Sequence, residues 1–150
     1  MEIIAKNKKA YYEYFIDKTL EAGIVLTGDE VKALRENKAS INEAFAETKN
    51  GELWLINADI ASYRNSAKIL ISDAKRKRKL LVKKKDISSL QGKVEREGYT
   101  IIPIKIYFNK KGFAKIEIAV AKGKKLYDKR EDKKQKDWNI QKQRLLRNLK

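Results

Sequence analysis

The ten residues from Ala121 to Arg130, AKGKKLYDKR, contain five Lys or Arg side chains together with one tyrosine, one aspartate and one glycine. Closely spaced cations of this kind can neutralise the phosphates of a nucleic acid and release its condensed counterions. An apolar-alternating segment ends immediately before this stretch, and a strongly charged, weakly apolar run follows it to Lys150. We interpret the stretch as the junction between a nucleic-acid-binding barrel and a basic arm that folds only against a partner.

The whole chain is basic, since 36 Lys and Arg against 20 Asp and Glu give its 150 residues a formal net charge of +16. So large an excess favours a polyanionic partner, because each neutralised phosphate releases counterions. The alternatives are a merely basic soluble protein and a protein of acidic membrane surfaces. The sequence has no lipidation motif and no strongly apolar amphipathic helix, so nucleic acid is the favoured partner.

The residue types that are absent exclude most catalytic chemistry. The chain has no cysteine and no histidine, hence no disulfide, thiolate site, imidazole base or histidine-rich metal site. It has neither a Walker A loop nor a G-x-G-x-x-G turn after a strand. The candidate carboxylates are scattered: Glu30, Asp59, Asp73, Asp86 and Asp128. We therefore expect a binding protein without catalytic residues, metal or cofactor. Without a membrane span or signal peptide, it is expected to be soluble and cytoplasmic.

An aromatic and β-branched run from Tyr11 to Ile16 begins the folded part and predicts a strand. Gly23 breaks this pattern, and residues 24–26 resume it as a short buried strand. Thr27-Gly28-Asp29 then predicts the start of a helix, because a short side-chain oxygen there satisfies free backbone amides. The helix is expected to continue to about Asn37.

Asn50-Gly51 is the strongest hairpin signal in the chain. It separates the strand-like segments 41–46 and 52–57. The second segment is apolar on both faces, so we expect it to be covered on both sides. Residues 59–73 show little periodicity and are predicted to form a loop.

Eight of the eleven residues from Lys75 to Lys85 are basic, with an apolar island at residues 80–82. This composition predicts a strand whose flanks face a polyanion. Residues 86–94 then carry apolar side chains at helical spacing, and Gly98 is placed to end that helix.

The clearest strand signal comes from Thr100–Phe108 and Ala114–Ala121, which a four-residue turn separates. Isoleucines alternate with polar residues along both segments, so we expect a long antiparallel hairpin with one buried face. Pro103 cannot donate to a strand ladder and is expected at an edge or a bulge.

About six short strands with two inserted helices favour a mainly β fold with flanking helices, a small OB-type closed β-barrel over residues 1–121. A ferredoxin-like sheet is the alternative, although its βαββαβ order fits less well. Residues 122–150 form a basic C-terminal tail with 12 Lys and Arg against four Asp and Glu. Trp138, Leu145 and Leu149 share one helical face, which predicts a tail that is disordered alone and helical when bound.

Four motifs closely resemble the SsrA-binding protein (SmpB) family: NKKA at Asn7–Ala10, EAGIVLTGDEVKALR at Glu21–Arg35, RKLLVKK at Arg78–Lys84 and AKGKKLYDKRED at Ala121–Asp132. The resemblance spans essentially the whole chain. It implies an OB-type barrel that binds the tRNA-like domain of transfer-messenger RNA (tmRNA) and helps to load it onto ribosomes stalled without an A-site codon. The barrel would stand in for the missing anticodon arm, and the tail would probe the empty mRNA path.

The resemblance also implies which barrel residues contact tmRNA: Asn7, Lys8, Lys9, Glu30, Leu81, Lys83 and Lys115. Glu30 could simply complement the helix dipole. The favoured interpretation places it in the RNA surface, where it accepts from a base edge or orients a neighbouring cation. For Leu81, two positions remain open: the hydrophobic core, which its sequence pattern favours, and the RNA surface, which the resemblance implies. Lys115 is expected to point outward by strand alternation, which suits a phosphate contact.

In the tail, the resemblance implies these ribosome contacts: Lys122, Lys124, Lys125, Tyr127, Asp128, Lys129, Arg130, Trp138, Lys142, Arg144, Leu145 and Leu146. The first three lysines are assigned to phosphates, because Gly123 lets the backbone come close. Tyr127 is assigned to stacking on an unstacked base of the decoding centre. The tail helix would place its basic face on ribosomal RNA, and its apolar stripe would fix its orientation.

The leading hypothesis is therefore a monomeric RNA-binding adaptor of trans-translation, the rescue of ribosomes stalled on non-stop mRNA. Its implied partners are the tRNA-like domain of tmRNA and the ribosome, where it would contact small-subunit rRNA, the decoding centre and the mRNA path. Through tmRNA it would also meet elongation factor Tu and alanyl-tRNA synthetase. The alternative is a ribosomal or initiation-type OB-fold RNA-binding protein, and a carboxylate nuclease is a distant third.

Overall fold

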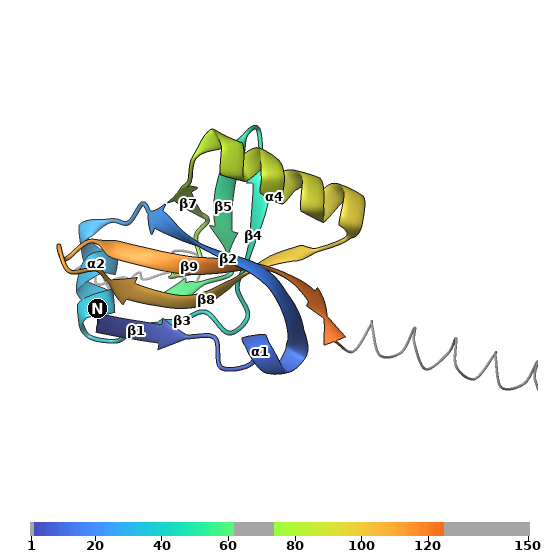
Figure 1. Ribbon diagram of the computed structural model, residues 1–150. Coiled ribbons are helices and arrows are strands. Elements are labelled where there is room, and N and C mark those ends of the chain that lie inside the picture. Colours follow the sequence, from blue (N-terminus) through green and yellow to red (C-terminus); the bar gives the residue numbers. More distant parts are fainter. Residues whose placement is uncertain (1, 62–73, 125–150) are drawn as a thin grey trace, which may run out of the picture.

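The structure is a computed structural model that describes residues 2–61 and 74–124. Strands dominate it and helices flank them, so the mainly β fold predicted from the sequence is confirmed (Figure 1). The elements in chain order are β1 (Glu2–Lys6), α1 (Ala10–Glu13), β2 (Tyr14–Ile24), α2 (Gly28–Arg35), β3 (Ala39–Ser40), β4 (Phe45–Lys49), β5 (Glu52–Ile56), β6 (Asp59–Ile60), β7 (Arg78–Leu81), α4 (Lys84–Glu97), β8 (Thr100–Phe108) and β9 (Ala114–Gly123).

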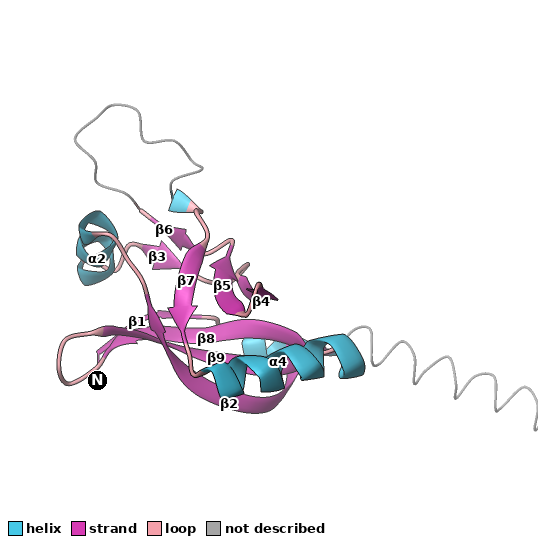
Figure 2. Cartoon of the chain, turned by 90° about the horizontal axis from the view of Figure 1, so that it is seen from above, coloured by secondary structure: helices cyan, strands magenta, loops and turns pink. Residues whose placement is uncertain are grey.

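The long strands close into a ring. Neighbouring strands follow the order β8-β4-β5-β7-β2-β9, and the pairing of β9 with β8 completes the circuit. Strand β8 carries β9 along one edge, while β4 and β1 pair with different parts of its other edge. Figure 2 shows β7 crossing the layer of β2, β8 and β9 at a steep angle. This closed antiparallel arrangement excludes the ferredoxin-like sheet considered from the sequence.

The ring encloses the main hydrophobic core. The strands of the ring fill this core mostly with isoleucine and leucine side chains, and α2 adds Leu34 at one end of the ring. Burying one such side chain contributes about 1.5–3 kcal/mol. The large apolar side chains at most 1% exposed are Leu34, Ile41, Leu53, Leu55, Ile60, Leu80, Ile101, Ile106, Ile116 and Ile118.

The hairpin of β8 and β9 is buried on both faces, so the prediction of one buried face is wrong. A second apolar cluster lies on the outer face, where Ile102 and Ile104 meet Ala119, Ala121 and Ala10 of α1. The register of β8 against β9 shifts between residues 103 and 105, which confirms the bulge predicted from the proline. Because the short α1 covers this face, residues that the sequence pattern left outside become core.

The Asn50-Gly51 hairpin is confirmed, with positive φ values of 54° and 74° at its two turn residues. Leu53 and Leu55 of β5 are fully buried, whereas the opposite face carries half-buried Trp54 and Ile56, so that face is covered only in part. The first strand lies nearer the turn than predicted, because β4 runs over Phe45–Lys49 rather than over residues 41–46. In the predicted loop 59–73, Asp59–Ile60 form β6, and residues 62–73 lie outside the described part.

The prediction for the N-terminal strand is partly wrong. Tyr11 and Tyr12 belong to α1, and β2 then runs for 11 residues straight through Gly23. Gly23 pairs with Leu81 on one side and Lys115 on the other. A Cβ added to it would lie 3.2 Å from the Leu81 Cβ, a tight contact, so Gly23 marks a close approach to the Leu81 side chain rather than a break in the strand.

Both longer helices lie close to where the sequence places them. The Thr27 side chain caps α2, which ends at Arg35, two residues before the predicted limit. Helix α4 runs from Lys84 to Glu97, and Gly98 caps it with a φ of 71°, the left-handed conformation favoured after a helix. In Figure 1, α4 lies along the upper side of the ring and α2 lies at its left end.

Candidate nucleic-acid interface

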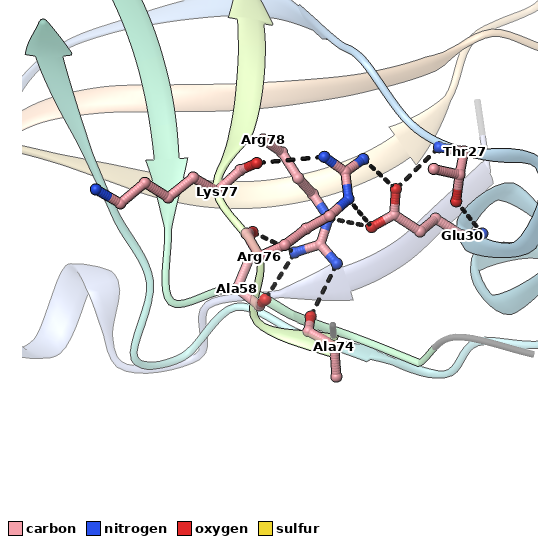
Figure 3. Close-up of polar contacts among 7 residues, drawn as sticks. All are labelled: Thr27, Glu30, Ala58, Ala74, Arg76, Lys77 and Arg78. Carbon is pink, nitrogen blue, oxygen red and sulfur yellow. Dashed lines mark hydrogen bonds and ion pairs between the residues drawn. The ribbon is translucent and has the colours of Figure 1, made fainter. Parts of the chain in front are cut away.

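A buried ion cluster joins α2 to β7 and the residues before it (Figure 3). The Glu30 backbone N–H donates to Thr27 Oγ1 (3.3 Å), and Glu30 Oε1 accepts from the Thr27 N–H (2.9 Å), which completes a capping box. The same carboxylate accepts from two arginines. Arg76 Nε and Arg78 Nε donate to Oε2 at 3.1 and 2.5 Å, and Arg76 Nη2 donates to Oε1. Glu30 is only 2% exposed.

Arg78 is fully buried, and its guanidinium forms hydrogen bonds in several directions. Nη1 donates to the carbonyl oxygens of Ala58 (2.9 Å) and Arg76 (3.1 Å), and Nη2 donates to that of Ala74 (2.8 Å). A buried charge is tolerated only when it is paired and hydrogen-bonded, and Glu30 supplies the pairing. Arg78 thereby ties the chain at Ala58 to the chain at Ala74, on either side of residues 62–73.

The cluster lowers the pKa of the Glu30 carboxyl group below its ordinary value of 4.5. Burial by itself raises that pKa, but the hydrogen bonds from Arg76 and Thr27 and the charge of Arg78 outweigh it. Glu30 is therefore a buried carboxylate that stays ionised.

Unfolding at acid pH tests this assignment. Because the folded pKa lies below the unfolded value of 4.5, Glu30 stabilises the protein fully above that pH and loses its contribution as the pH falls through the folded pKa. We expect the difference in unfolding free energy between the wild type and Glu30→Gln to be constant near neutrality and to shrink below about pH 4.5. Urea unfolding at several pH values measures it. A difference that does not change with pH would contradict the assignment.

Glu30, Asn7 and Arg78 lie inside the fold, which corrects three expectations. The Glu30 carboxylate is almost completely buried, so it is not exposed to a base edge. It instead orients the neighbouring cations Arg76 and Arg78, which is the second role considered for it. Asn7 is 7% exposed, and its Nδ2 donates to the Pro103 carbonyl (3.1 Å), so its side chain holds β1 to β8 instead of facing solvent. The basic strand β7 also turns its first residue, Arg78, inward rather than toward a polyanion.

An apolar groove forms at the end of β2 nearest α2. Leu81 is 55% exposed and Phe113 is 63% exposed, so Leu81 lies on the surface rather than in the core. Both line a cavity of about 360 Å³ together with Gly23, Val31 and Lys115. Lys83, two residues beyond Leu81, is exposed. The structure thus brings two predicted residues, Leu81 and Lys115, together at the groove, and Lys83 lies on the surface two residues further along the chain from Leu81.

The other predicted residues of the described part lie at the opposite end of β2 and β9. Lys8 and Lys9 are exposed immediately before α1. Lys122 and Lys124 are half-buried where β9 ends, close to the start of the grey trace in Figure 1. Lys122 follows Lys115 by seven positions along β9, which is roughly 23 Å along an extended strand. The expected barrel residues therefore form two groups rather than one continuous patch.

The remaining predicted ribosome contacts lie outside the described residues and stay predictions: Lys125, Tyr127, Asp128, Lys129, Arg130, Trp138, Lys142, Arg144, Leu145 and Leu146. The division of the chain at residue 121 also stays a prediction. Strand β9 continues to Gly123, so any separate tail begins after that residue.

Four residues of the ion cluster and of the tail end of the barrel cannot be singled out from the sequence. Arg76 and Arg78 belong to a basic run, and no local signal distinguishes a buried arginine from an exposed one. Phe15 and Tyr99 have no local signal that would set them apart from other strand and loop aromatics. Their ring contacts with lysines become visible only when β2, β9 and α4 are placed together.

Residues 2–61 and 74–124 meet the requirements of neither a metal site nor a membrane-spanning helix. These residues contain no group of three or more Asp or Glu side chains that could hold a metal ion. None of the helices described there is long and apolar enough to cross a membrane.

Comparison with known proteins places the chain among relatives of one kind. Residues 4–148 match the family described as SmpB protein. A curated SsrA-binding protein of Nitrobacter hamburgensis is 52% identical over 147 residues, covering 98% of this chain and 93% of the relative. One of Sinorhizobium fredii is 51% identical, covering 97% of this chain and 91% of the relative.

A solved structure gives the same result for the fold. It is described as "tmRNA-SmpB: a journey to the center of the bacterial ribosome", and one of its chains matches this protein with a TM-score of 0.65 and 45% identity. The match covers 79% of this chain and 82% of that one. With the closed barrel, the sequence motifs and the near-complete coverage of the relatives in agreement, this chain belongs to the SmpB protein family.

Proposed function

We propose that this protein binds the tRNA-like domain of tmRNA and delivers it to ribosomes stalled on non-stop mRNA. The observation that carries the proposal is its alignment, over nearly all its length, with relatives named SsrA-binding protein. The protein acts as a cytoplasmic monomer without catalysis of its own. It meets elongation factor Tu and alanyl-tRNA synthetase only through tmRNA.

The groove end of the barrel is the surface that we assign to tmRNA. Leu81 and Phe113 offer exposed apolar contact to an unstacked base or a sugar, while Lys83 and Lys115 supply cations for adjacent phosphates. Glu30 acts from beneath this surface, because it fixes α2 against β7, the strand that carries Leu81. The proposed role of Glu30 is therefore to position the groove.

The opposite end and the tail are assigned to the ribosome. The tail would follow the empty mRNA path, with Tyr127 stacking on a base of the decoding centre and Asp128, Lys129 and Arg130 beside it. Lys122, Lys124 and Lys125 would contact phosphates where the tail leaves the barrel. Lys8 and Lys9 lie at this same end, so we transfer them from the tmRNA surface to the ribosome surface. The residues assigned to accommodation are Trp138, Lys142, Arg144, Leu145 and Leu146.

Replacing Leu81 by aspartate tests the tmRNA surface. The change places a negative charge in the groove, and we expect the affinity for the tRNA-like domain to fall by roughly tenfold or more. Leu81 is 55% exposed, so the unfolding free energy should change by no more than about 0.5 kcal/mol. Fluorescence-anisotropy titration and thermal unfolding measure the two effects.

Phe45→Asp is the matched control, since Phe45 is an exposed apolar residue of β4 and does not line the groove. It should leave the affinity for the tRNA-like domain unchanged. Equal losses of affinity in Leu81→Asp and Phe45→Asp would show that only the net charge of the protein matters. That result would contradict the assignment of the groove to tmRNA.

A further inference from the structure

Tyr107 and Glu21 form a hydrogen bond that spans three strands on the outer face of the barrel. Tyr107 of β8 lies opposite Lys115 of β9, and Glu21 of β2 lies opposite Glu117 of β9. The Tyr107 hydroxyl donates to Glu21 Oε2 and so reaches across β9. Tyr107 is only 5% exposed, whereas Glu21 lies on the surface. A buried phenol thereby fixes the position of an exposed carboxylate.

The hydroxyl of Tyr107 keeps its proton in this contact. Burial, and then the hydrogen bond to the Glu21 carboxylate, raise the pKa of Tyr107 above its ordinary value of 10.0. An ionised carboxylate has about four lone-pair directions on its two oxygens. Tyr107 uses one of them, so the Glu21 carboxylate can still accept from a ligand that carries two donors.

Glu21 lies where a sheet ordinarily disfavours a carboxylate. Like charges directly opposite each other on neighbouring strands are destabilising, and Glu21 lies opposite Glu117. Glu117 is compensated by Lys105, whose Nζ lies 3.4 Å from Glu117 Oε2. Within the part of the chain that the structure describes, Glu21 forms no ion pair, and a neutral hydroxyl holds it instead. One carboxylate is therefore both oriented and uncompensated.

This carboxylate borders the groove that is assigned to tmRNA. Tyr107, Lys115, Gly23 and Leu81 are successive partners across β8, β9, β2 and β7, and the last three of them line the groove. Glu21 precedes Gly23 by two positions on the same face of β2, roughly 7 Å along the strand. A ligand that lies in the groove between Lys115 and Leu81 therefore comes within reach of Glu21.

The surroundings of Glu21 favour an RNA ligand over a basic peptide. Among the described residues Lys115 forms no ion pair, so its charge would repel a cationic side chain but attract a phosphate. Leu81 and Phe113 are exposed beside it and offer apolar contact to a base or a sugar. A carboxylate amid such contacts is suited to accept hydrogen bonds from a base edge.

The two oxygens of a carboxylate match one base best. On its Watson–Crick edge an unpaired guanine presents two adjacent donors, the N1–H and the N2 amino group. The corresponding edge of adenine, cytosine or uracil carries a single donor group. Unpaired bases of RNA are commonly read on this edge. The geometry of Glu21 therefore favours guanine.

We propose that Glu21, positioned by Tyr107, recognises the Watson–Crick edge of one unpaired guanine while Lys115 contacts a neighbouring phosphate. The inference rests on the proposed function for the identity of the RNA, the tRNA-like domain of tmRNA. The guanine contact itself stands on the arrangement of Glu21, Tyr107 and Lys115. Separate experiments test these two points.

The first experiment tests guanine recognition without tmRNA. Single-stranded oligouridylates with one central guanosine or one central inosine compete for the full-length protein, because inosine lacks the 2-amino group and keeps the N1–H. The wild type should bind the guanosine oligonucleotide at least about fivefold more tightly. Glu21→Gln should lose this preference, because its amide offers one acceptor and one donor to the two donors of guanine. Equal binding of both oligonucleotides by the wild type, or an undiminished preference in Glu21→Gln, would overturn the guanine contact.

The second experiment tests the source of the guanine, with Glu117→Gln as the matched control. Each variant removes one negative charge from the same face, so charge alone predicts that both bind the tRNA-like domain more tightly. The inference predicts that Glu21→Gln binds it at least about fivefold more weakly and that Glu117→Gln binds it as tightly as the wild type or more so. Unchanged or tighter binding by Glu21→Gln, or equal losses in both variants, would overturn the assignment to tmRNA. A wild type that fails to bind the tRNA-like domain would instead contradict the proposed function.

Tyr107→Phe tests the positioning role. This variant keeps the buried ring but removes the hydroxyl, so Glu21 is free to turn away. We expect a smaller preference for the guanosine oligonucleotide than in the wild type. Adding Tyr107→Phe to Glu21→Gln should cause no further loss of affinity for the tRNA-like domain. Additive losses would contradict the positioning of Glu21 by Tyr107.

Thermal unfolding of the variants excludes a general loss of structure. Glu21 is exposed, and Tyr107→Phe retains the ring in its buried position. All variants should therefore remain folded at the temperature of the binding experiments.

Discussion

Deleting residues 125–150 is expected to reduce the tagging of nascent chains on non-stop messages to background. The same variant should bind the tRNA-like domain of tmRNA within roughly threefold of the wild type at physiological salt. The physical reason is that the groove is built from residues up to 115, all of which remain. The deleted segment carries ten Lys and Arg against four Asp and Glu, a net charge of +6. This charge is expected to contribute mainly nonspecific electrostatic attraction to RNA. A reconstituted translation reaction measures tagging, and filter binding measures affinity.

A variant with the full charge of the tail is the matched control. Replacing Tyr127, Trp138, Leu145 and Leu146 by alanine removes the proposed stacking and apolar contacts but no charge. This variant should lose tagging as the deletion does, and should bind the tRNA-like domain like the wild type. Loss of affinity for that domain in either variant would contradict the division between a tmRNA-binding barrel and a ribosome-binding tail.

Replacing Glu30 by glutamine is expected to destabilise the fold by about 3–5 kcal/mol, the cost of leaving a buried charge without its partner. Glutamine can still accept from the Thr27 N–H, so the cap is largely retained. The guanidinium of Arg78, at 0% exposure, loses its counter-charge, whereas that of Arg76 is 37% exposed and is solvated. Urea unfolding at pH 7 measures the loss. A change of less than about 1 kcal/mol would contradict the role given to the ion pair.

Two further variants show whether the loss comes from Arg78. Glu43→Gln changes an exposed carboxylate and should cost no more than about 0.5 kcal/mol. In Glu30→Gln/Arg78→Met the buried charge disappears together with its partner. The double variant should therefore be less destabilised than the sum of the two single variants by about 1 kcal/mol or more. Additive effects would show that Glu30 and Arg78 act independently.

The elements that local chemistry determines could be predicted from the sequence. The Asn50-Gly51 turn, the Thr27 cap and the Gly98 helix end each depend on a few adjacent residues, and each is present. The closed barrel followed from the number of short strands and their turns. The family resemblance, carried by the AKGKKLYDKRED motif and three others, supplied the functional hypothesis.

What could not be predicted depends on contacts between distant segments. Arginine is a residue type that is usually exposed. Only the packing of α2 against β7 buries Arg78 beside Glu30. Asn7 is buried because β1 pairs with β8, about 100 residues away. The same limit applies to the candidate site, where the lysines were anticipated but the pairing of Lys122 with Tyr99 was not.

The two surfaces of the proposed function lie toward opposite ends of one strand ladder. The ladder of β2 and β9 runs from Gly23, which pairs with Lys115 at the groove, to Phe15, which pairs with Lys122 where β9 ends, with one register shift between residues 16 and 18. The register of these two strands therefore determines how far apart the proposed tmRNA surface and the proposed ribosome surface lie.

The most direct test of the proposed function compares two RNAs. The dissociation constant of the full-length protein is measured for the tRNA-like domain of tmRNA and for a tRNA of similar length, in the same buffer at physiological salt. Specific recognition predicts that the tRNA-like domain binds at least about tenfold more tightly. Equal dissociation constants would contradict the proposal and favour a general OB-fold RNA-binding protein of the ribosome.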